Sequence, residues 1–143
     1  MTPTIIVHGG AKTITDNKVA PNNAGCTAAA EAGWAVLISG GTAAEAVEAA
    51  TRVLEADLTF NAGLDATLNS DKEVELDAAI MEGSLSWRAI APPTPGANAA
   101  VQGIRHPISV VRKMMDEKPR LLVARGGECF ARDCGAEMPR YAK

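Results

Sequence analysis

The stretch from Phe60 to Gly83 constrains the fold more than any other part of the chain, because it predicts a β-hairpin. Phe60 to Gly63 is typical of a turn entry, and Ala66 to Asn69 has the pattern of a short strand. Ser70 to Glu73 is rich in turn-forming polar residues, and Val74 to Met81 is predicted as a longer strand. A chain with such a hairpin is expected to contain a β-sheet rather than helices alone.

Two helical patterns precede the hairpin. The first is predicted to begin with Asn22 or Asn23 as its cap and to end at Ile38, before a pair of glycines. In the second, Thr42 is a favourable N-cap, and Glu45 three residues later completes a capping box. Apolar residues then recur at helical spacing, and small residues in both segments allow close packing: the apolar positions are Val47, Ala50, Val53 and Leu54, and the small ones are Ala29, Gly33, Ala46 and Ala50.

The remaining segments alternate between strand and helix patterns. Pro107 suits the first turn of a helix through about Glu117, whose apolar face is Val110, Val111, Met114 and Met115. Three prolines between residues 92 and 95 predict a loop instead of a central strand. The other predicted elements are strands at Thr4 to Val7, Ala97 to Ile104 and Leu121 to Ala124, and a last helix at Gly126 to Cys134. This mixed order favours an α+β fold over a regular parallel sheet.

Composition narrows the classes of function. At 143 residues the chain is long enough for one hydrophobic core, and its net charge of −3 argues against a nucleic-acid or anionic-membrane partner. No apolar run approaches the roughly 20 residues of a membrane span, and the start of the chain lacks a signal-peptide pattern, so we expect a cytoplasmic protein. The odd set of three cysteines predicts buried or idle thiols, rather than a zinc site or disulfide framework: Cys26, Cys129 and Cys134.

Several blocks, in the right order and with near-normal spacing, resemble the plant-type asparaginase and isoaspartyl-peptidase family of N-terminal-nucleophile hydrolases. The most specific is the hairpin segment, which is similar to the family pattern FNAGxGSVLNxxGxVExDAxIMDG. The others are a strand with an HGG loop, a helix pair, a helix start and a late strand: Ile5 to Ala11, Gly33 to Ala50, Ile104 to Ser109 and Leu121 to Glu128. The resemblance therefore covers nearly the whole chain.

The resemblance implies a fold and a partner. It implies that residues 1–143 are a single-domain piece, the α-subunit half of a four-layer αββα sandwich, completed by a separate β subunit. In this family the nucleophile is a threonine freed by autoproteolysis at the start of the β subunit, and two αβ units form a heterotetramer. No such threonine position lies on this chain. Half a sandwich leaves a sheet face uncovered, which also predicts a partner chain.

The resemblance also implies an activity and site residues. The expected activity is hydrolysis of L-asparagine and β-aspartyl (isoaspartyl) dipeptides, with no organic cofactor. Supporting roles near the threonine are implied for Asn61 and for the loop residues His8, Gly9 and Gly10. A structural sodium ion is implied, bound by the backbone carbonyls of Leu54, Glu55, Asp57, Phe60, Ala62 and Leu64.

Other interpretations of these residues stay open. Asn61 could bond its own backbone in an Asx turn, and the HGG loop could be a plain strand-to-loop turn. Asp65 departs from the family's glycine, which would strain the backbone if φ were positive there and would put the sodium loop in doubt. Glu75 and Asp77 alternate on one strand, where a solvent-facing pair is favoured over an acid/base pair.

Rival functions also stay open. The chain could be an inactive scaffold or a truncated relative without a nucleophile subunit, or a relative with other substrates, such as a protease for larger proteins or a glycosylasparaginase. A conventional serine or cysteine hydrolase is poorly supported, because there is no GxSxG elbow. Thr2, followed by proline, is a poor N-terminal nucleophile.

Two segments depart from the family pattern. Lys12 replaces a glycine at the far end of the HGG loop. The stretch from Trp87 to Pro95 is an apparent insertion rich in proline. We expect it either to fold back on its own subunit, to contact the other αβ unit, or to form a rim over the active-site entrance.

Overall fold

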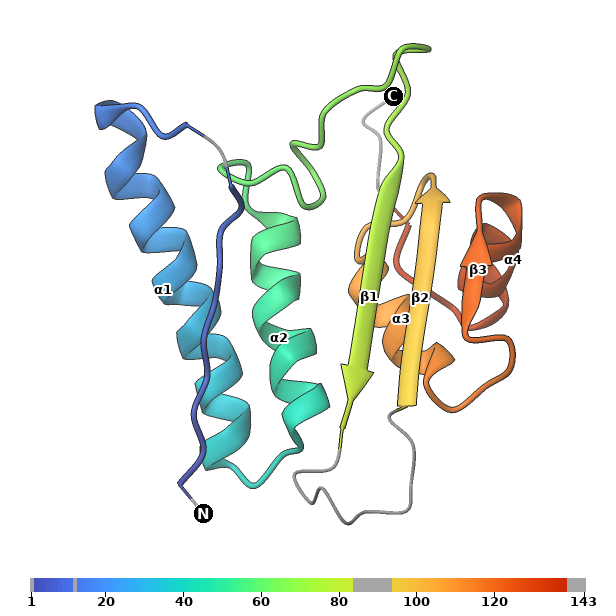
Figure 1. Ribbon diagram of the computed structural model, residues 1–143, viewed down its shortest axis with the longest axis horizontal. Coiled ribbons are helices and arrows are strands. Elements are labelled where there is room, and N and C mark those ends of the chain that lie inside the picture. Colours follow the sequence, from blue (N-terminus) through green and yellow to red (C-terminus); the bar gives the residue numbers. More distant parts are fainter. Residues whose placement is uncertain (1, 12, 84–93, 139–143) are drawn as a thin grey trace. The chain divides into compact units, whose positions relative to one another are not determined.

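The computed structural model describes residues 2–11, 13–83 and 94–138 (Figure 1). The chain divides into two compact units, Met1–Thr67 and Leu68–Lys143. The first unit is helical, and the second is a small sheet with helices. The expectation of a single domain completed by a partner chain stays a prediction. Among the described residues, no helix has the length and apolar character needed to cross a membrane.

The first unit consists of α1 (Asp16–Ile38) and α2 (Ala43–Ala56), which lie side by side (Figure 1). Small residues form their contact, as predicted: Ala29 and Ala46 are buried, and Gly33 packs against α2. A β-carbon added at Gly33 would lie 2.8 Å from the carbonyl oxygen of Ala46 and 3.3 Å from the β-carbon of Ala50. Glycine is therefore needed at this helix crossing, because a side chain would push the helices apart.

The predicted start of α1 is wrong. The helix begins at Asp16, with Thr15 as its N-cap, and continues through Pro21 instead of starting at Asn22 or Asn23. Asn22 is buried within the helix, and its side-chain amide donates to the carbonyl of Lys18 at 2.7 Å. Its hydrogen bond therefore goes back along the helix, whereas an N-cap side chain would accept one from the amides ahead of it.

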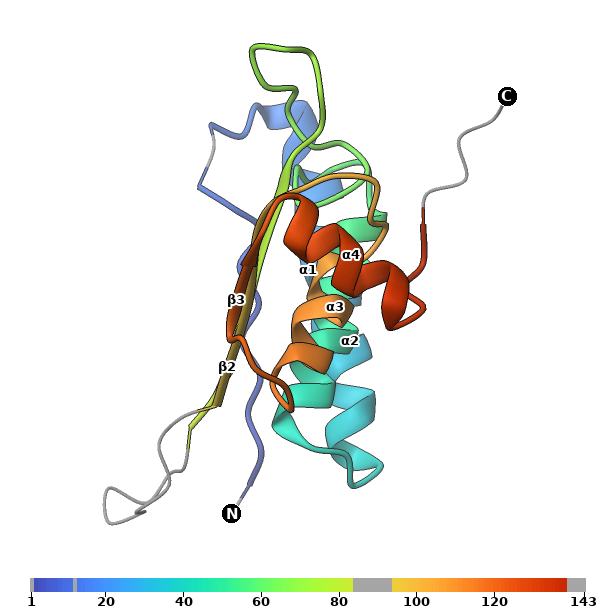
Figure 2. The ribbon, with the colours of Figure 1, turned by 90° about the vertical axis from the view of Figure 1, so that its right-hand side faces the viewer.

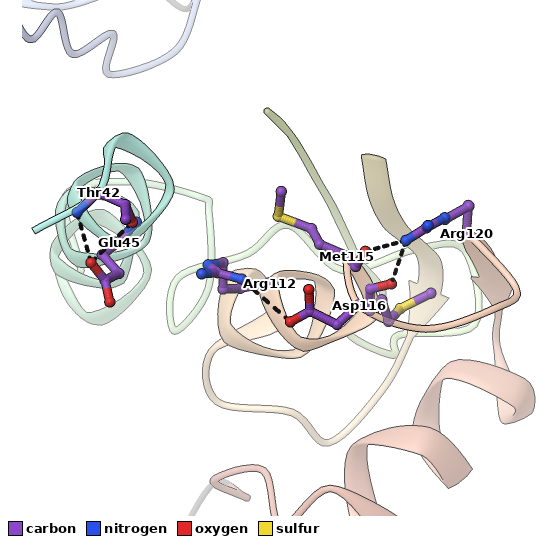
Figure 3. Close-up of polar contacts among 7 residues, drawn as sticks. Thr42, Glu45, Arg112, Met115, Asp116 and Arg120 are labelled. Atoms are coloured by element: carbon purple, nitrogen blue, oxygen red, sulfur yellow. Dashed lines mark hydrogen bonds and ion pairs between the residues drawn. The ribbon is translucent and has the colours of Figure 1, made fainter. Parts of the chain in front are cut away.

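The predicted start of α2 is confirmed. Thr42 Oγ1 accepts from the backbone N–H of Glu45 at 3.2 Å, and Glu45 Oε2 accepts from the backbone N–H of Thr42 at 2.7 Å (Figure 3). These reciprocal bonds satisfy two amides that a helix start would otherwise leave without partners.

The predicted first strand at Thr4 to Val7 is wrong. Residues 2–11 form an extended segment that runs along the two helices without strand pairing, and Ile6 is 89% exposed (Figure 1). A strand requires hydrogen bonds to a neighbouring strand. Among the described residues, the first unit contains none to pair with.

The second unit contains a three-stranded sheet in the order β1 (Leu76–Glu82), β2 (Thr94–Val101) and β3 (Leu121–Val123). β1 and β2 are antiparallel, and β2 and β3 are parallel (Figure 1). This mixed sheet agrees with the predicted α+β class. The four-layer sandwich stays a prediction.

The hairpin is shorter than predicted. The turn is present, because the backbone N–H of Asn69 donates to the carbonyl of Glu73 at 2.9 Å. However, Ala66 to Asn69 is not a strand, and β1 begins at Leu76 instead of Val74. The side-chain oxygen of Asn69 accepts from the amides of Asp71 and Glu73, so the turn is held by a side chain and not by a continuing ladder.

The second strand is also shifted from its prediction. β2 spans Thr94–Val101 instead of Ala97 to Ile104, and Pro95 pairs with Met81 near the strand's start. The prediction that the prolines exclude a central strand is therefore wrong for Pro95, which lies in the middle strand of the sheet. Pro95 is at the end of β2 that pairs with β1 alone, because β3 pairs only with Ala97 to Ala99, and proline is better tolerated where one side of a strand is unpaired. Ala100 and Gly103 have φ angles of 51° and 64°, which turn the chain and end the strand early.

Helices α3 (Pro107–Met114) and α4 (Arg125–Asp133) cover one face of this sheet (Figure 2). Pro107 occupies the first turn of α3, and the predicted apolar face is confirmed: Val110, Val111, Met114 and Met115 are all buried. α3 ends three residues before the predicted Glu117. The Arg120 guanidinium donates to the carbonyl of Met115 beside that end (Figure 3).

Among the described residues, no helix of this unit covers the opposite face of the sheet (Figure 2). Along β1 and β3, exposed residues alternate with more buried ones, so the exposed side chains belong to that face. Met81, Leu121 and Val123 are 68%, 56% and 53% exposed. We call these three residues the open sheet face. Exposed apolar sheet of this kind is a common interface with another chain or another part of the same protein.

Candidate functional site

The loop after α2, from Asp57 to Asp65, is organised by its own backbone. The N–H of Phe60 donates to the carbonyl of Asp57 at 3.1 Å, and the N–H of Leu64 returns to the carbonyl of Glu55 at 3.0 Å. The Asp57 carboxylate accepts from the N–H of Thr59 at 2.8 Å. These bonds close the loop onto the last turn of α2, so its two ends lie together.

Of the six carbonyls implied as sodium ligands, those of Leu54 and Glu55 lie in the last turn of α2 and the other four on the loop. Three already accept one backbone hydrogen bond each: Leu54 from Asp57, Glu55 from Leu64, and Asp57 from Phe60. Each carbonyl oxygen has two lone pairs, so these bonds leave room for a cation. These hydrogen bonds are therefore compatible with the donor set, and the sodium site stays a prediction.

The shape of the loop depends on the close backbone approach at Gly63 and on the backbone conformation of Asp65. A β-carbon at Gly63 would collide with the Glu55 backbone, lying 2.9 Å from its Cα, so the close approach requires glycine. Asp65 is not among the described non-glycine residues with positive φ, which are Lys72, Ala100 and Ala124. The strain considered for aspartate in place of glycine is therefore absent, and that objection to the sodium loop is removed.

Phe60 joins this loop to the N-terminal segment and to α1. Its ring is buried, with 2% exposure. A β-carbon added at Gly9 would lie 2.7 Å from the ring, and the ring also presses on Gly25 of α1. Only residues without a side chain leave space for the ring on these two sides. Phe60 therefore fixes the HGG loop against the loop that carries Asn61.

The HGG loop has the backbone geometry that its glycines allow. Gly10 has a φ of 97°, and its N–H donates to Nδ1 of the exposed His8 at 3.2 Å. The same glycines therefore permit both the turn and the approach of Phe60. A supporting role beside a nucleophile stays a prediction.

Asn61 lines an open pocket of about 470 Å³ in the first unit. Its side chain is exposed and makes no hydrogen bond to another described residue, so it does not form the alternative Asx turn; Asp57 makes that kind of bond instead. The other residues lining the pocket are Lys18, Pro21, Leu58, Thr59, Asp65 and Thr67. The Asn61 amide is therefore available to an external group.

The predicted site residues do not all face one hollow. His8 lines a separate hollow of about 140 Å³ between the N-terminal segment and α2, whereas Asn61 faces the larger pocket. Phe60 links the two loops physically. Sequence reasoning missed the linking role of the Phe60 ring and the place of Lys18 in the pocket. Neither leaves a local pattern, because each depends on contacts more than 30 residues away along the chain.

The carboxylates of Glu75 and Asp77 are solvent-exposed, as expected. Asp77 accepts from the backbone N–H of Ala100 at 2.8 Å, beside a bulge where the pairing of β1 and β2 shifts. The buried Asn98 accepts from the N–H of Ala78 at the same irregularity. Asp77 therefore has a structural partner, which supports a structural role for it instead of an acid/base role. Glu75 lies just before β1, so the two residues do not share a strand as predicted.

The cysteines Cys26, Cys129 and Cys134 are free and half-buried. The described residues contain no group of three or more His, Cys, Asp or Glu side chains arranged for a metal ion. This finding concerns side-chain ligands and does not bear on backbone carbonyls. Lys12 and most of the insertion from Trp87 to Pro95 lie outside the described residues.

Comparison with known proteins gives a consistent result. A family model described as Asparaginase matches residues 1–142. The chain is 40% identical over 134 residues to rat isoaspartyl peptidase/L-asparaginase, covering 92% of this chain and 38% of the rat protein. It is 40% identical over 138 residues to the human protein of that name, covering 95% and 40%. It is 43% identical over 139 residues to the plant-type L-asparaginase of Pyrococcus abyssi, covering 96% and 42%. The chain spans about two-fifths of the length of these curated relatives.

Proposed function

This chain belongs to the asparaginase family, and on that basis we propose that it is the α subunit of an isoaspartyl peptidase/L-asparaginase. The proposed substrates are L-asparagine and β-aspartyl dipeptides. One observation carries the proposal: nearly the whole chain aligns at about 40% identity with proteins named for these two activities. Family membership supports a hydrolase. The identity of the substrates is our inference from the relatives' names.

The proposed nucleophile is a threonine at the start of a separate β subunit. Its hydroxyl attacks the side-chain amide of asparagine, or the isopeptide carbonyl of a β-aspartyl dipeptide, while its free α-amine takes up the hydroxyl proton. The carbonyl–nitrogen bond breaks, and ammonia or an amino acid leaves with that proton. Water then hydrolyses the acyl-enzyme and releases aspartate.

Within this scheme, the described chain supplies position and hydrogen bonding. The Asn61 amide is exposed and unpartnered among the described residues, so it can hold the threonine or the reacting group. Phe60 fixes the HGG loop against the loop that carries Asn61. Because a misplacement of about 1 Å can cost about 100-fold in rate, the buried ring has a direct bearing on turnover.

The open sheet face supports a partner chain. A stable assembly would cover the apolar side chains of Met81, Leu121 and Val123, which the second unit itself leaves exposed. We assign this role to the β subunit, with two αβ units forming a heterotetramer in the cytoplasm. The relatives' greater length leaves room for a second subunit encoded in the same precursor.

The precursor that carries this chain is expected to yield a companion polypeptide beginning with threonine. Intact mass spectrometry and N-terminal sequencing of the purified protein test this, together with release of ammonia from L-asparagine. A variant of the precursor with that threonine replaced by alanine is the control, and should remain uncut. An uncut or single-subunit protein without activity would instead support the inactive scaffold.

Sodium is expected to stabilise the assembled protein, because a ligand bound only by the folded state favours that state. At a concentration about 100 times the Kd the gain is about 2.7 kcal/mol. Thermal unfolding in sodium chloride and in tetramethylammonium chloride, at equal ionic strength, measures the difference. Gly63→Ala should reduce it by forcing the loop away from Glu55. Equal melting temperatures in the two salts would remove the proposed site.

A further inference from the structure

The pocket beside Asn61 contains two side chains of opposite charge that the protein does not use itself. Lys18 comes from the first turn of α1, and Asp65 from the loop after α2. Within the described part of the chain, neither side chain forms an ion pair. Two separate elements thus bring a cation and an anion to one hollow, and both charges remain available to a ligand.

The rest of the pocket suits a small polar molecule with an apolar part. Thr59 and Thr67 line it along with Asn61, and Pro21 and Leu58 form apolar wall. Its volume of about 470 Å³ leaves room for an amino-acid residue beyond the reacting amide. Most of the lining residues are therefore polar, with a short apolar wall, which suits a ligand with several polar groups.

The two proposed substrates differ in what they would place there. Asparagine releases ammonia, so only its amide NH2 group extends past the scissile bond. A β-aspartyl dipeptide carries a second residue past that bond, with a free α-carboxylate and a side chain. A lysine can pair with the carboxylate, and an aspartate favours a basic side chain over an acidic one.

We propose that this pocket is the subsite for the leaving residue of a β-aspartyl dipeptide. Lys18 binds the α-carboxylate of that residue, and Asp65 selects a basic side chain on it. The inference rests on the proposed function, because the pocket adjoins the reacting bond only if Asn61 lies beside the threonine. Asp65 stands where the family pattern has glycine, so a relative with glycine there would lack this carboxylate.

The test is a comparison of substrates on the assembled two-subunit enzyme. L-asparagine serves as the internal reference, with β-aspartyl-leucine, β-aspartyl-lysine and β-aspartyl-glutamate as the dipeptides. Lys18→Glu should raise KM for β-aspartyl-leucine by about three- to tenfold, since exposed charge pairs contribute at most about 1 kcal/mol each. The same variant should leave kcat and KM for asparagine unchanged. Lys18→Arg should retain the wild-type KM.

The charge of Asp65 is tested by the ratio of kcat/KM for β-aspartyl-lysine to that for β-aspartyl-glutamate. Asp65→Lys should lower this ratio by about tenfold or more, and Asp65→Glu should preserve it. Lys72→Glu, a charge reversal at an exposed lysine outside the pocket, is the matched control and should change neither quantity.

The outcomes separate this inference from the function on which it rests. If the wild-type enzyme hydrolyses asparagine and the dipeptides but the variants keep the wild-type pattern, the subsite is refuted and the proposed function stands. Equal changes for asparagine and the dipeptides would show a structural effect and also refute it. If the wild-type enzyme hydrolyses none of them, the proposed function fails and the subsite fails with it. Where one charge reversal prevents folding, the other and its conservative partner still decide the question.

Discussion

Replacing Phe60 with alanine is expected to lower the free energy of unfolding by about 3–5 kcal/mol, as for other large-to-small changes in a core. The ring is 2% exposed and lies against Gly9 and Gly25, neither of which has a side chain that could fill the space left behind. Urea unfolding of the assembled protein measures the loss. Leu58→Ala, in the same loop but 68% exposed, is the matched control and should change stability by no more than about 0.5 kcal/mol.

The Phe60→Ala variant should also loosen the HGG loop, because the ring is the contact that holds Gly9 to the loop after α2. Hydrogen exchange at the Gly9 and Gly10 amides should become faster than in the Leu58→Ala control. Unchanged exchange, or a stability equal to that of the control, would show that the two loops are held together by other contacts.

Replacing Asn61 with alanine is expected to have the opposite profile: a large effect on the reaction and little on stability. Turnover or autocleavage should fall by about 10- to 100-fold, equivalent to about 1.4–2.7 kcal/mol of transition-state stabilisation. The free energy of unfolding should change little, because the exposed amide makes no hydrogen bond to another described residue and the folded chain loses little when it is removed.

The Asn61 measurement combines steady-state kinetics with asparagine, the rate of precursor cleavage and urea unfolding. Asn23→Ala, at an exposed asparagine of α1, is the control and should keep the wild-type rates. An Asn61→Ala enzyme that matures and turns over normally would reduce Asn61 to a surface residue of the loop. It would also remove the reason for placing the neighbouring pocket beside the chemistry.

Local signals were predicted well from the sequence. The capping box of Thr42 and Glu45 is present because both of its hydrogen bonds join residues within a four-residue segment. Pro107 begins α3, since its fixed φ and missing N–H suit a helix start wherever the helix later packs. The apolar face of α3 follows from a spacing that every α-helix shares.

Features that depend on distant partners could not be predicted in this way. Thr4 to Val7 has strand-forming residues but no neighbouring strand among the described residues of its unit, and β2 takes its limits from its pairing with β1. The candidate site shows the same division. Its glycines and Asn61 were identified from motif resemblance, whereas the burial of Phe60 and the presence of Lys18 and Asp65 in one pocket come from tertiary structure alone. A helix cap depends on atoms a few residues apart, but a core contact or a pocket depends on where remote segments come together in space.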